Sequence, residues 1–269
     1  YNSRDAEQIV ARAAEVGITL FDTAEMYGFG KSESILGAAL AAHDLLDAAY
    51  VATKHFPLLP IAPLVRRTAR ASAERLGVST IDLYQVHSWD TNTPIDETLQ
   101  ALDDVVRAGK VRYVGASNLQ AYQLARATGR AEVLGTKRFD SVQPRYNLLF
   151  REFEREMFPL CREEGIAVIP YNPLAGGFLS GKHKDPTATA DGTRFAEGDQ
   201  GARYRERYWH ERMFAVVDEM RDLVGGDIGQ HGRRRHDQAP GIHQRAVMGA
   251  RAPARAGIAQ RDAADLAAD

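Results

Sequence analysis

Four residues of this sequence are suited to proton chemistry: Asp22, Tyr27, Lys54 and His87. Three of them end short segments with the β-branched and apolar composition of buried strands. These segments are 18–22 (ITLFD), 50–54 (YVATK) and 81–87 (IDLYQVH), and Tyr27 follows Asp22 by five residues. In a parallel α/β barrel the carboxyl ends of the strands converge on one face, where the chemistry takes place. The spacing therefore predicts one site shared by three strand ends.

These four side chains could together deliver a proton to a carbonyl group. A tyrosine phenol has a pKa of roughly 10, so it is a useful acid near neutral pH only when a nearby cation stabilises its phenolate. Lys54 can supply that cation, and Asp22 can keep the lysine charged and oriented. His87 can donate a hydrogen bond to the carbonyl oxygen. No side chain carries a hydride, so a carbonyl reduction here would require a nicotinamide cofactor.

Helix-like and strand-like segments alternate along most of the chain. Helices are expected at 5–16, 32–40, 63–76, 94–108, 120–128 and 152–164, and further strands at 111–117, 141–143 and 166–171. This βαβα order with short connections predicts a parallel sheet with helices outside it. Six strands before residue 172 are fewer than a closed (β/α)8 barrel needs, and 246–250 (AVMGA) is a candidate for another. We therefore expect one α/β domain over 1–269, an incomplete TIM barrel without its first strand.

The segment 225–245 interrupts this pattern. Its first part, GGDIGQHGRRRHDQ, has no apolar periodicity and stands where the seventh barrel helix is expected. A solvated basic loop, a nucleic-acid or metal patch and a shifted reading frame are the alternatives. The His and Arg residues lack a repeated metal-ligand spacing, so we expect a disordered or altered segment and no metal site. A barrel with unpaired edges and a disrupted seventh helix is expected to be poorly stable or inactive when expressed alone.

Composition narrows the class of protein further. The formal net charge of −2 gives no basic field for nucleic acid. The single cysteine, Cys161, rules out an intramolecular disulfide and fits the reducing cytoplasm. No apolar run approaches the roughly 20 residues of a membrane span, and the first residues carry no signal-peptide pattern. We expect a cytoplasmic protein with a small-molecule substrate and neither a nucleic-acid nor a membrane partner.

The motifs around the four residues resemble those of the aldo-keto reductase superfamily. Residues 21–28 (FDTAEMYG), Thr53-Lys54 and Val86-His87 occur in that family's order, and the resemblance covers almost all of 5–182. The resemblance is to the longer-loop branch of the family, which includes potassium-channel β-subunits. The resemblance implies reduction of an aldehyde or ketone with NADPH. It also implies Tyr27 as the proton donor.

The resemblance also implies a set of NADP-binding residues. Ser117, Asn118 and Gln143 would offer amide and hydroxyl groups that suit the neutral nicotinamide carboxamide. The Tyr171 ring would stack on the nicotinamide, and the loop after Tyr171 would hold the pyrophosphate. Gly249 and Arg251 would lie beside the eighth strand and hold the 2′-phosphate. In chain order the implied residues are Ser117, Asn118, Gln143, Tyr171 (the stacking ring), Asn172, Leu174, Gly176, Lys182, Gly249 and Arg251 (the phosphate partner).

Alternative functions remain open from the residues alone. Lys54 at a strand end could form a Schiff base, as in barrel aldolases, and a non-catalytic nicotinamide-binding regulatory subunit is a third class. Glycine-rich nucleotide motifs do not fit, because Glu25 occupies a Walker glycine position and no G-x-G-x-x-G follows a strand. The polar segment 185–210 is interpreted as a long loop, either a lid or disordered. Tyr204, Tyr208 and Trp209 could cover a pocket or anchor a helix that begins near Tyr204.

Overall fold

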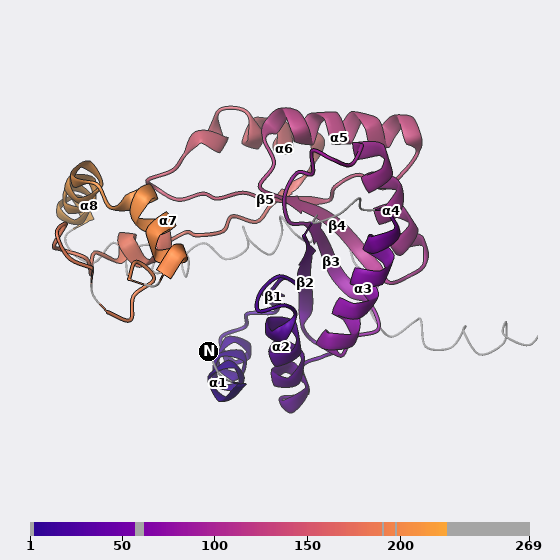
Figure 1. The fold of residues 1–269 in the computed structure, drawn as a ribbon, viewed down its shortest axis with the longest axis horizontal. Coiled ribbons are helices and arrows are strands. Elements are labelled where there is room, and N and C mark those ends of the chain that lie inside the picture. Colours follow the sequence, from indigo (N-terminus) through magenta and orange to yellow (C-terminus); the bar gives the residue numbers. More distant parts are fainter. Residues whose placement is uncertain (1–2, 57–61, 190, 197, 225–269) are drawn as a thin grey trace, which may run out of the picture.

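Six parallel strands form one curled sheet in sequential order, β1 to β6 (Figure 1). The structure is a computed structural model that describes residues 3–56, 62–189, 191–196 and 198–224. The strands are β1 Leu20–Asp22, β2 Tyr50–His55, β3 Ile81–Val86, β4 Val111–Ser117, β5 Ser141–Gln143 and β6 Ala167–Val168. Each pairs in parallel with the next, from β1 with β2 to β5 with β6. All six side chains of β3 are buried, as expected of a central strand covered on both faces.

Helices connect successive strands and cover the outside of the sheet (Figure 1). They are α1 Ser3–Glu15, α2 Lys31–Ala42, α3 Ala62–Leu76, α4 Ile95–Arg107, α5 Ala121–Leu134 and α6 Met157–Glu164, with a 3-10 turn η1 Glu152–Glu154. Consecutive helices from α1 to α6 pack side by side. The main core lies between these helices and β3 to β5, where Leu99, Leu102 and Val114 are fully enclosed. Burial of these apolar side chains stabilises the layered arrangement.

The predicted fold class is confirmed: the described residues form the curled, incomplete part of a TIM (β/α)8 barrel. No strand precedes α1 among the described residues. Some predicted bounds were wrong. The last strand covers only Ala167–Val168 of the expected 166–171, and the helix at 152–164 is split into η1 and α6. The helix expected at 120–128 continues to Leu134, because Gly129 is tolerated inside it and Gly135, at φ 64°, supplies the left-handed cap.

A separate C-terminal lobe lies beyond the sheet, on the side of β5 and β6 (Figure 1). It consists of the 3-10 helix η2 Ala175–Ser180, α7 Gly198–Tyr208 and α8 Glu211–Val224. Its core is aromatic and includes Phe178, Phe195, Tyr208 and Phe214. The prediction of one long loop over 185–210 is therefore partly wrong, because residues 198–208 are helical.

Two sequence-based expectations lie outside the described residues: the altered segment 225–245 and the candidate strand 246–250. Among the helices that the structure describes, none is both long and apolar enough to cross a membrane. The described part of the chain also holds no cluster of His, Cys, Asp and Glu suited to a metal ion.

Candidate active site

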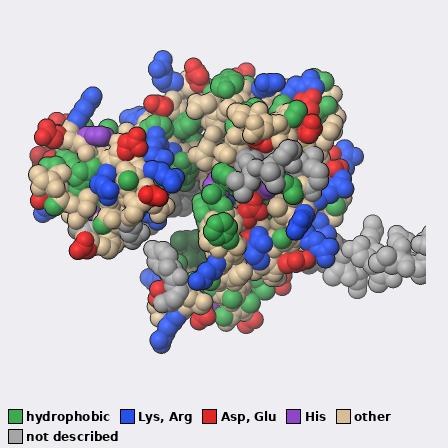
Figure 2. Space-filling model, in the orientation of Figure 1, with side chains coloured by type: hydrophobic (Ala, Val, Ile, Leu, Met, Phe, Trp, Pro, Cys, Tyr) green, Lys and Arg blue, Asp and Glu red, His purple; other side chains and the backbone are tan. Residues whose placement is uncertain are grey.

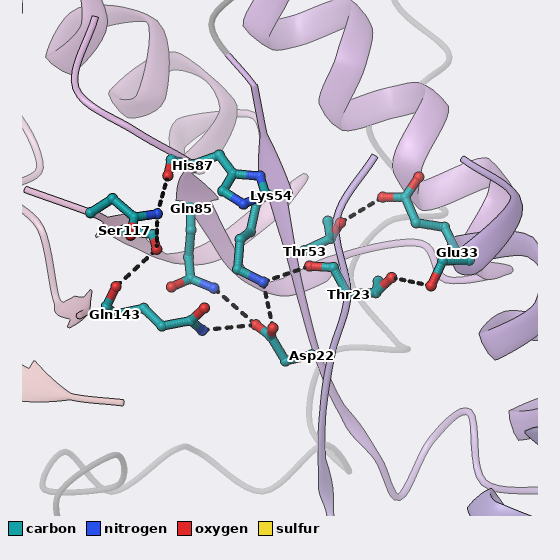
Figure 3. Close-up of polar contacts among 11 residues, drawn as sticks. Asp22, Thr23, Glu33, Thr53, Lys54, Gln85, His87, Ser117 and Gln143 are labelled. Carbon is teal, nitrogen blue, oxygen red and sulfur yellow. Dashed lines mark hydrogen bonds and ion pairs between the residues drawn. The ribbon is translucent and has the colours of Figure 1, made fainter. Parts of the chain in front are cut away.

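The carboxyl ends of the strands bring the predicted site residues to one edge of the sheet. Asp22 ends β1, Ser117 ends β4 and Gln143 ends β5, while Lys54 is the last but one residue of β2. His87 follows β3 directly and donates its backbone N–H to the carbonyl of His55 over 2.8 Å. Because the strands are parallel, these ends lie next to one another, and Figure 3 shows their side chains pointing toward a common centre.

A buried ion pair between Lys54 and Asp22 is the centre of the site. The Lys54 side chain is 1% exposed and that of Asp22 is 34% exposed. The Lys54 ammonium donates to Asp22 Oδ2 and, over 2.8 Å, to the backbone carbonyl of Thr23. Burial lowers the pKa of Lys54, and the Asp22 carboxylate opposes this shift. The carboxylate thus keeps a cation inside a desolvated site.

Asp22 accepts two further hydrogen bonds. Gln85 Nε2 and Gln143 Nε2 each donate to Asp22 Oδ1 over 3.1 Å (Figure 3). Lys54 holds one carboxylate oxygen and the two amides hold the other. Sequence reasoning missed Gln85, because an amide inside a strand that is buried on both faces leaves no alternating polar pattern.

Tyr27 lies in the loop that follows β1, beside both Lys54 and His87. The Lys54 ammonium is 5.6 Å from the centroid of the Tyr27 ring. The His87 and Tyr27 rings meet edge to face, with centroids 5.8 Å apart. Tyr27 is 45% exposed, so one side of the ring faces solvent. The four residues predicted for proton chemistry therefore form one contiguous group.

The pKa of Tyr27 does not shift in the direction expected from the sequence. Burial raises it above its ordinary value, and the charge of Asp22 raises it further. Lys54 was expected to lower this pKa, but its charge is already paired with Asp22. Tyr27 is therefore protonated at neutral pH and available as a donor, without being a stronger acid than a free tyrosine.

His87 is held neutral by its surroundings. Burial lowers its pKa to about 4, and the positive charge of Lys54 contributes to the shift. Its ring also packs edge to face on Phe56, with centroids 5.8 Å apart. The buried Nδ1 has no hydrogen-bond partner among the described residues. A neutral imidazole has one N–H donor, which suits a hydrogen bond to a carbonyl oxygen.

Glu25 fastens the loop that carries Tyr27 to the end of β2. Its backbone N–H donates to the Lys54 carbonyl over 3.2 Å. Its Oε1 accepts from the backbone N–H of Phe56 over 2.8 Å and lies 3.0 Å from His55 Nδ1. Burial raises the pKa of Glu25, but the hydrogen bonds from His55 and Phe56 outweigh it and the net shift is downward. No sequence pattern indicated this role, although Glu25 stands between Asp22 and Tyr27.

The residues expected to contact the nicotinamide form a second polar group beside the first. Asn118 Nδ2 donates to the His87 carbonyl over 2.9 Å and to Ser117 Oγ over 3.1 Å. The Tyr171 hydroxyl donates to Asn118 Oδ1 over 2.8 Å. Asn118 adopts the left-handed conformation, with φ 57°, which Asn tolerates better than most residues. Asn118 thus contacts the backbone of His87 directly and links Ser117 and Tyr171 to it.

The loop after Tyr171 leads into the C-terminal lobe. Asn172, at φ 67°, accepts the Gly176 N–H on its Oδ1 over 2.7 Å, so this donor, expected to face a phosphate, has a partner within the chain. Leu174 is exposed. Gly176 and Gly177 both have positive φ angles, 71° and 98°. A Cβ on Gly177 would lie 3.3 Å from the Lys182 ammonium, so Lys182 stands beside this turn.

The C-terminal lobe adds a cation that was not predicted. The Arg194 guanidinium lies over the Tyr204 ring, 5.5 Å from its centroid. A Cβ on Gly176 would lie 3.6 Å from the side chain of Arg194. Figure 2 shows Lys and Arg side chains on the part of the lobe that looks toward the sheet. The sequence does not predict this position, because a single Arg in a polar loop belongs to no motif.

The aromatic residues of 198–209 anchor the lobe. Tyr208 is 2% exposed, and its hydroxyl accepts from Asn147 Nδ2 over 3.0 Å and from Asn172 Nδ2 over 2.9 Å. Trp209 packs on the aromatic core, and its Nε1 donates to the Pro186 carbonyl over 2.8 Å. Tyr204 is buried against Gly176. The helix begins at Gly198, six residues before the expected start.

Gly249 and Arg251, expected to hold the 2′-phosphate, lie outside the described residues. The other predicted site residues lie near the strand ends or in the loop after β6, except Gly176, which lies in η2, and Lys182, which follows η2 in the lobe. The structure therefore brings together the proton-transfer group and the residues expected at the nicotinamide end of a cofactor.

Comparisons with known proteins agree with this geometry. The aldo/keto reductase family model matches residues 1–223. An aldo-keto reductase of Fusarium vanettenii is 35% identical over 66% of this chain and 57% of its own length. The versiconal hemiacetal acetate reductase of Aspergillus parasiticus is 33% identical over 85% of this chain and 74% of its own length. A putative aryl-alcohol dehydrogenase of Schizosaccharomyces pombe is 34% identical over 64% and 58%. The chain thus spans a little more than half the length of several relatives that it matches, and it belongs to the aldo/keto reductase family.

Proposed function

We propose that this protein reduces an aldehyde or ketone to the alcohol, with NADPH as the hydride source and Tyr27 as the proton donor. The observation that carries the proposal is the contiguous group of a buried Lys54–Asp22 pair with the Tyr27 and His87 rings beside it. Family membership and relatives named as reductases support the reaction class.

The proton side of the reaction follows from these side chains. The raised pKa of Tyr27 keeps its hydroxyl protonated until a stronger base forms. The oxygen of a reduced carbonyl is such a base, so the proton moves from the Tyr27 hydroxyl to that oxygen. Neutral His87 donates a hydrogen bond to the same oxygen and orients it. The Lys54 ammonium lies close enough to stabilise the tyrosinate that remains.

The residues present suit a nicotinamide cofactor, which supplies the hydride when bound. Ser117, Asn118 and Gln143 offer the mixed donors and acceptors that a carboxamide requires. Among the described residues Gln143 Oε1 receives no hydrogen bond, so it remains open as an acceptor. Tyr171 offers a half-buried aromatic face close to Asn118. Lys182 and Arg194 stand near the Gly176-Gly177 turn, where two cations suit a pyrophosphate.

The experiment compares the wild-type protein with Tyr27→Phe. Because the chain is expected to be poorly stable alone, turnover is measured on protein that melts cooperatively in the presence of NADPH. On that protein we expect wild type to oxidise NADPH when an aliphatic or aromatic aldehyde is added. We expect the variant to lose turnover while its NADPH affinity, measured by fluorescence titration, changes less than about twofold, because the cofactor contacts remain. Undiminished turnover in Tyr27→Phe would rule out Tyr27 as the donor.

The same preparations separate the alternative functions. A Schiff-base aldolase would be inactivated by borohydride in the presence of a carbonyl substrate through a covalent bond to Lys54. A reductase would form no such adduct. A nicotinamide-binding regulatory subunit would bind NADPH but oxidise none in the presence of any aldehyde.

A further inference from the structure

Gln85 is an amide buried in the interior of the sheet, directly beneath the catalytic group. It lies on β3 in register with Lys54 on β2, and its exposed fraction is 0%. Its Nε2 donates to Asp22 Oδ1 over 3.1 Å (Figure 3). Its Oε1 has no partner among the described residues. A buried amide with an unpartnered oxygen is destabilising, whereas an apolar side chain would fill the same place without that penalty.

The strand next to Gln85 leaves room for this amide. Gly115 on β4 is the register partner of Gln85. A Cβ on Gly115 would lie 3.1 Å from Gln85 Cγ and 2.5 Å from Ser141 Oγ. The glycine therefore permits a long side chain at position 85 to reach across toward Asp22.

Asp22 needs a second anchor because it is partly open to solvent. Its side chain is 34% exposed, so water competes with Lys54 for the carboxylate. Gln143 also donates to Oδ1, but Gln143 is expected to contact the cofactor as well. The side chain of Gln85 makes no other hydrogen bond among the described residues. It is the anchor whose only polar contact is with Asp22.

We propose that Gln85 is a positioning residue that holds the Asp22 carboxylate against Lys54 and so keeps Lys54 protonated beside Tyr27. Its effect on turnover rests on the proposed function. Its effect on Lys54 does not, because that effect requires only the three side chains already in contact. The two consequences are therefore measured separately.

The test uses NMR of the protein labelled with 13C at the lysine Cε positions. Lysines occur at Lys31, Lys54, Lys110, Lys137, Lys182 and Lys184, and a Lys54→Arg variant assigns the Lys54 signal. In Gln85→Met the side-chain length is kept and the donor is lost, so we expect the pKa of Lys54 to fall below its wild-type value. The control is Gln123→Met, the same replacement of a buried Gln in the capping box of α5, which should leave Lys54 unchanged.

A second variant separates positioning from general loosening of the fold. In Gln85→Glu the side chain either donates as a neutral acid or adds a negative charge near Lys54, so the pKa of Lys54 stays at or above the wild-type value. A fall in both Gln85 variants would indicate loosening and overturn the proposal. An unchanged Lys54 titration in Gln85→Met would overturn it too.

Turnover supplies the third readout. We expect Gln85→Met to reduce kcat roughly tenfold, as loss of one hydrogen bond to a charged group implies, with NADPH affinity within about twofold of wild type. A wild-type protein that reduces no aldehyde contradicts the proposed function, and the Lys54 titration still decides the role of Gln85. Wild-type kcat in Gln85→Met would contradict the positioning role in catalysis.

Discussion

Replacing Asp22 with Asn changes the smallest number of atoms at the centre of the site. Three donors converge on the carboxylate: Lys54 on one oxygen, and Gln85 and Gln143 on the other. An asparagine has one oxygen and one NH2 group in these two places. Whichever way the amide turns, its NH2 group faces at least one of the three donors. The variant therefore removes both a charge and a geometric match.

The size of the effect follows from burial. Breaking a buried ion pair by removing one partner typically costs about 3–5 kcal/mol. The Lys54 side chain is 1% exposed, but Asp22 is 34% exposed, so solvent screens part of the interaction. We expect a loss of about 2 kcal/mol in the free energy of unfolding. If the same interaction is lost in the transition state, kcat falls roughly thirtyfold.

Two measurements test this prediction: urea unfolding followed by circular dichroism, and NADPH oxidation with an aldehyde. The matched control is Asp96→Asn, which breaks a surface ion pair with Arg130 and should change neither quantity much. The reasoning is refuted if Asp22→Asn unfolds and turns over like wild type. It is also refuted if Asp96→Asn has an equal effect, because the loss would then not depend on burial.

Three further predictions concern the rest of the site. Tyr171→Ala should weaken NADPH binding while Tyr171→Phe, which keeps the ring, should retain most of it; equal titrations for both would exclude stacking. The pKa of His87 is lowered to about 4, so its contribution to stability is full above pH 6.5 and is lost as the pH falls toward 4. His87→Gln should therefore make the melting temperature less dependent on pH between 6.5 and 4. A pH profile of the melting temperature equal to that of wild type would contradict this. Gly176→Ala should destabilise the lobe by about 1–3 kcal/mol, because its Cβ would lie 2.5 Å from the Tyr204 ring. Gly192→Ala, also at positive φ but in open space, should lower the melting temperature less. Equal losses of stability in the two variants would exclude the clash.

The place of the candidate catalytic group could be predicted from sequence because its members lie at the end of a recognisable strand or in the loop after one. Asp22 ends β1 and His87 directly follows β3, and the parallel order of the strands places those ends together. Periodicity alone gave this juxtaposition, and the family resemblance added the roles. Ser117, which ends β4, and Asn118, which follows it, were instead implied by the family resemblance alone.

Other features depend on three-dimensional contacts that no local pattern encodes. Gln85 lies within a strand buried on both faces, so its polarity does not alternate with its neighbours. The raised pKa of Tyr27 depends on burial and on the pairing of Lys54 with Asp22. The early start of α7 was missed because 198–203 is polar, and the helix is fixed by Tyr204 and Tyr208, which pack one turn apart in the lobe core.

The proposed reaction is a hydride transfer to a carbonyl carbon coupled to proton donation by Tyr27. The most direct measurement uses NADPH carrying deuterium at the transferable position, with mass spectrometry of the alcohol product. We predict one deuterium on the former carbonyl carbon with wild type, and no product with Tyr27→Phe under conditions where it still binds the cofactor. Unlabelled alcohol from wild type, or labelled alcohol at the wild-type rate from Tyr27→Phe, would contradict the account.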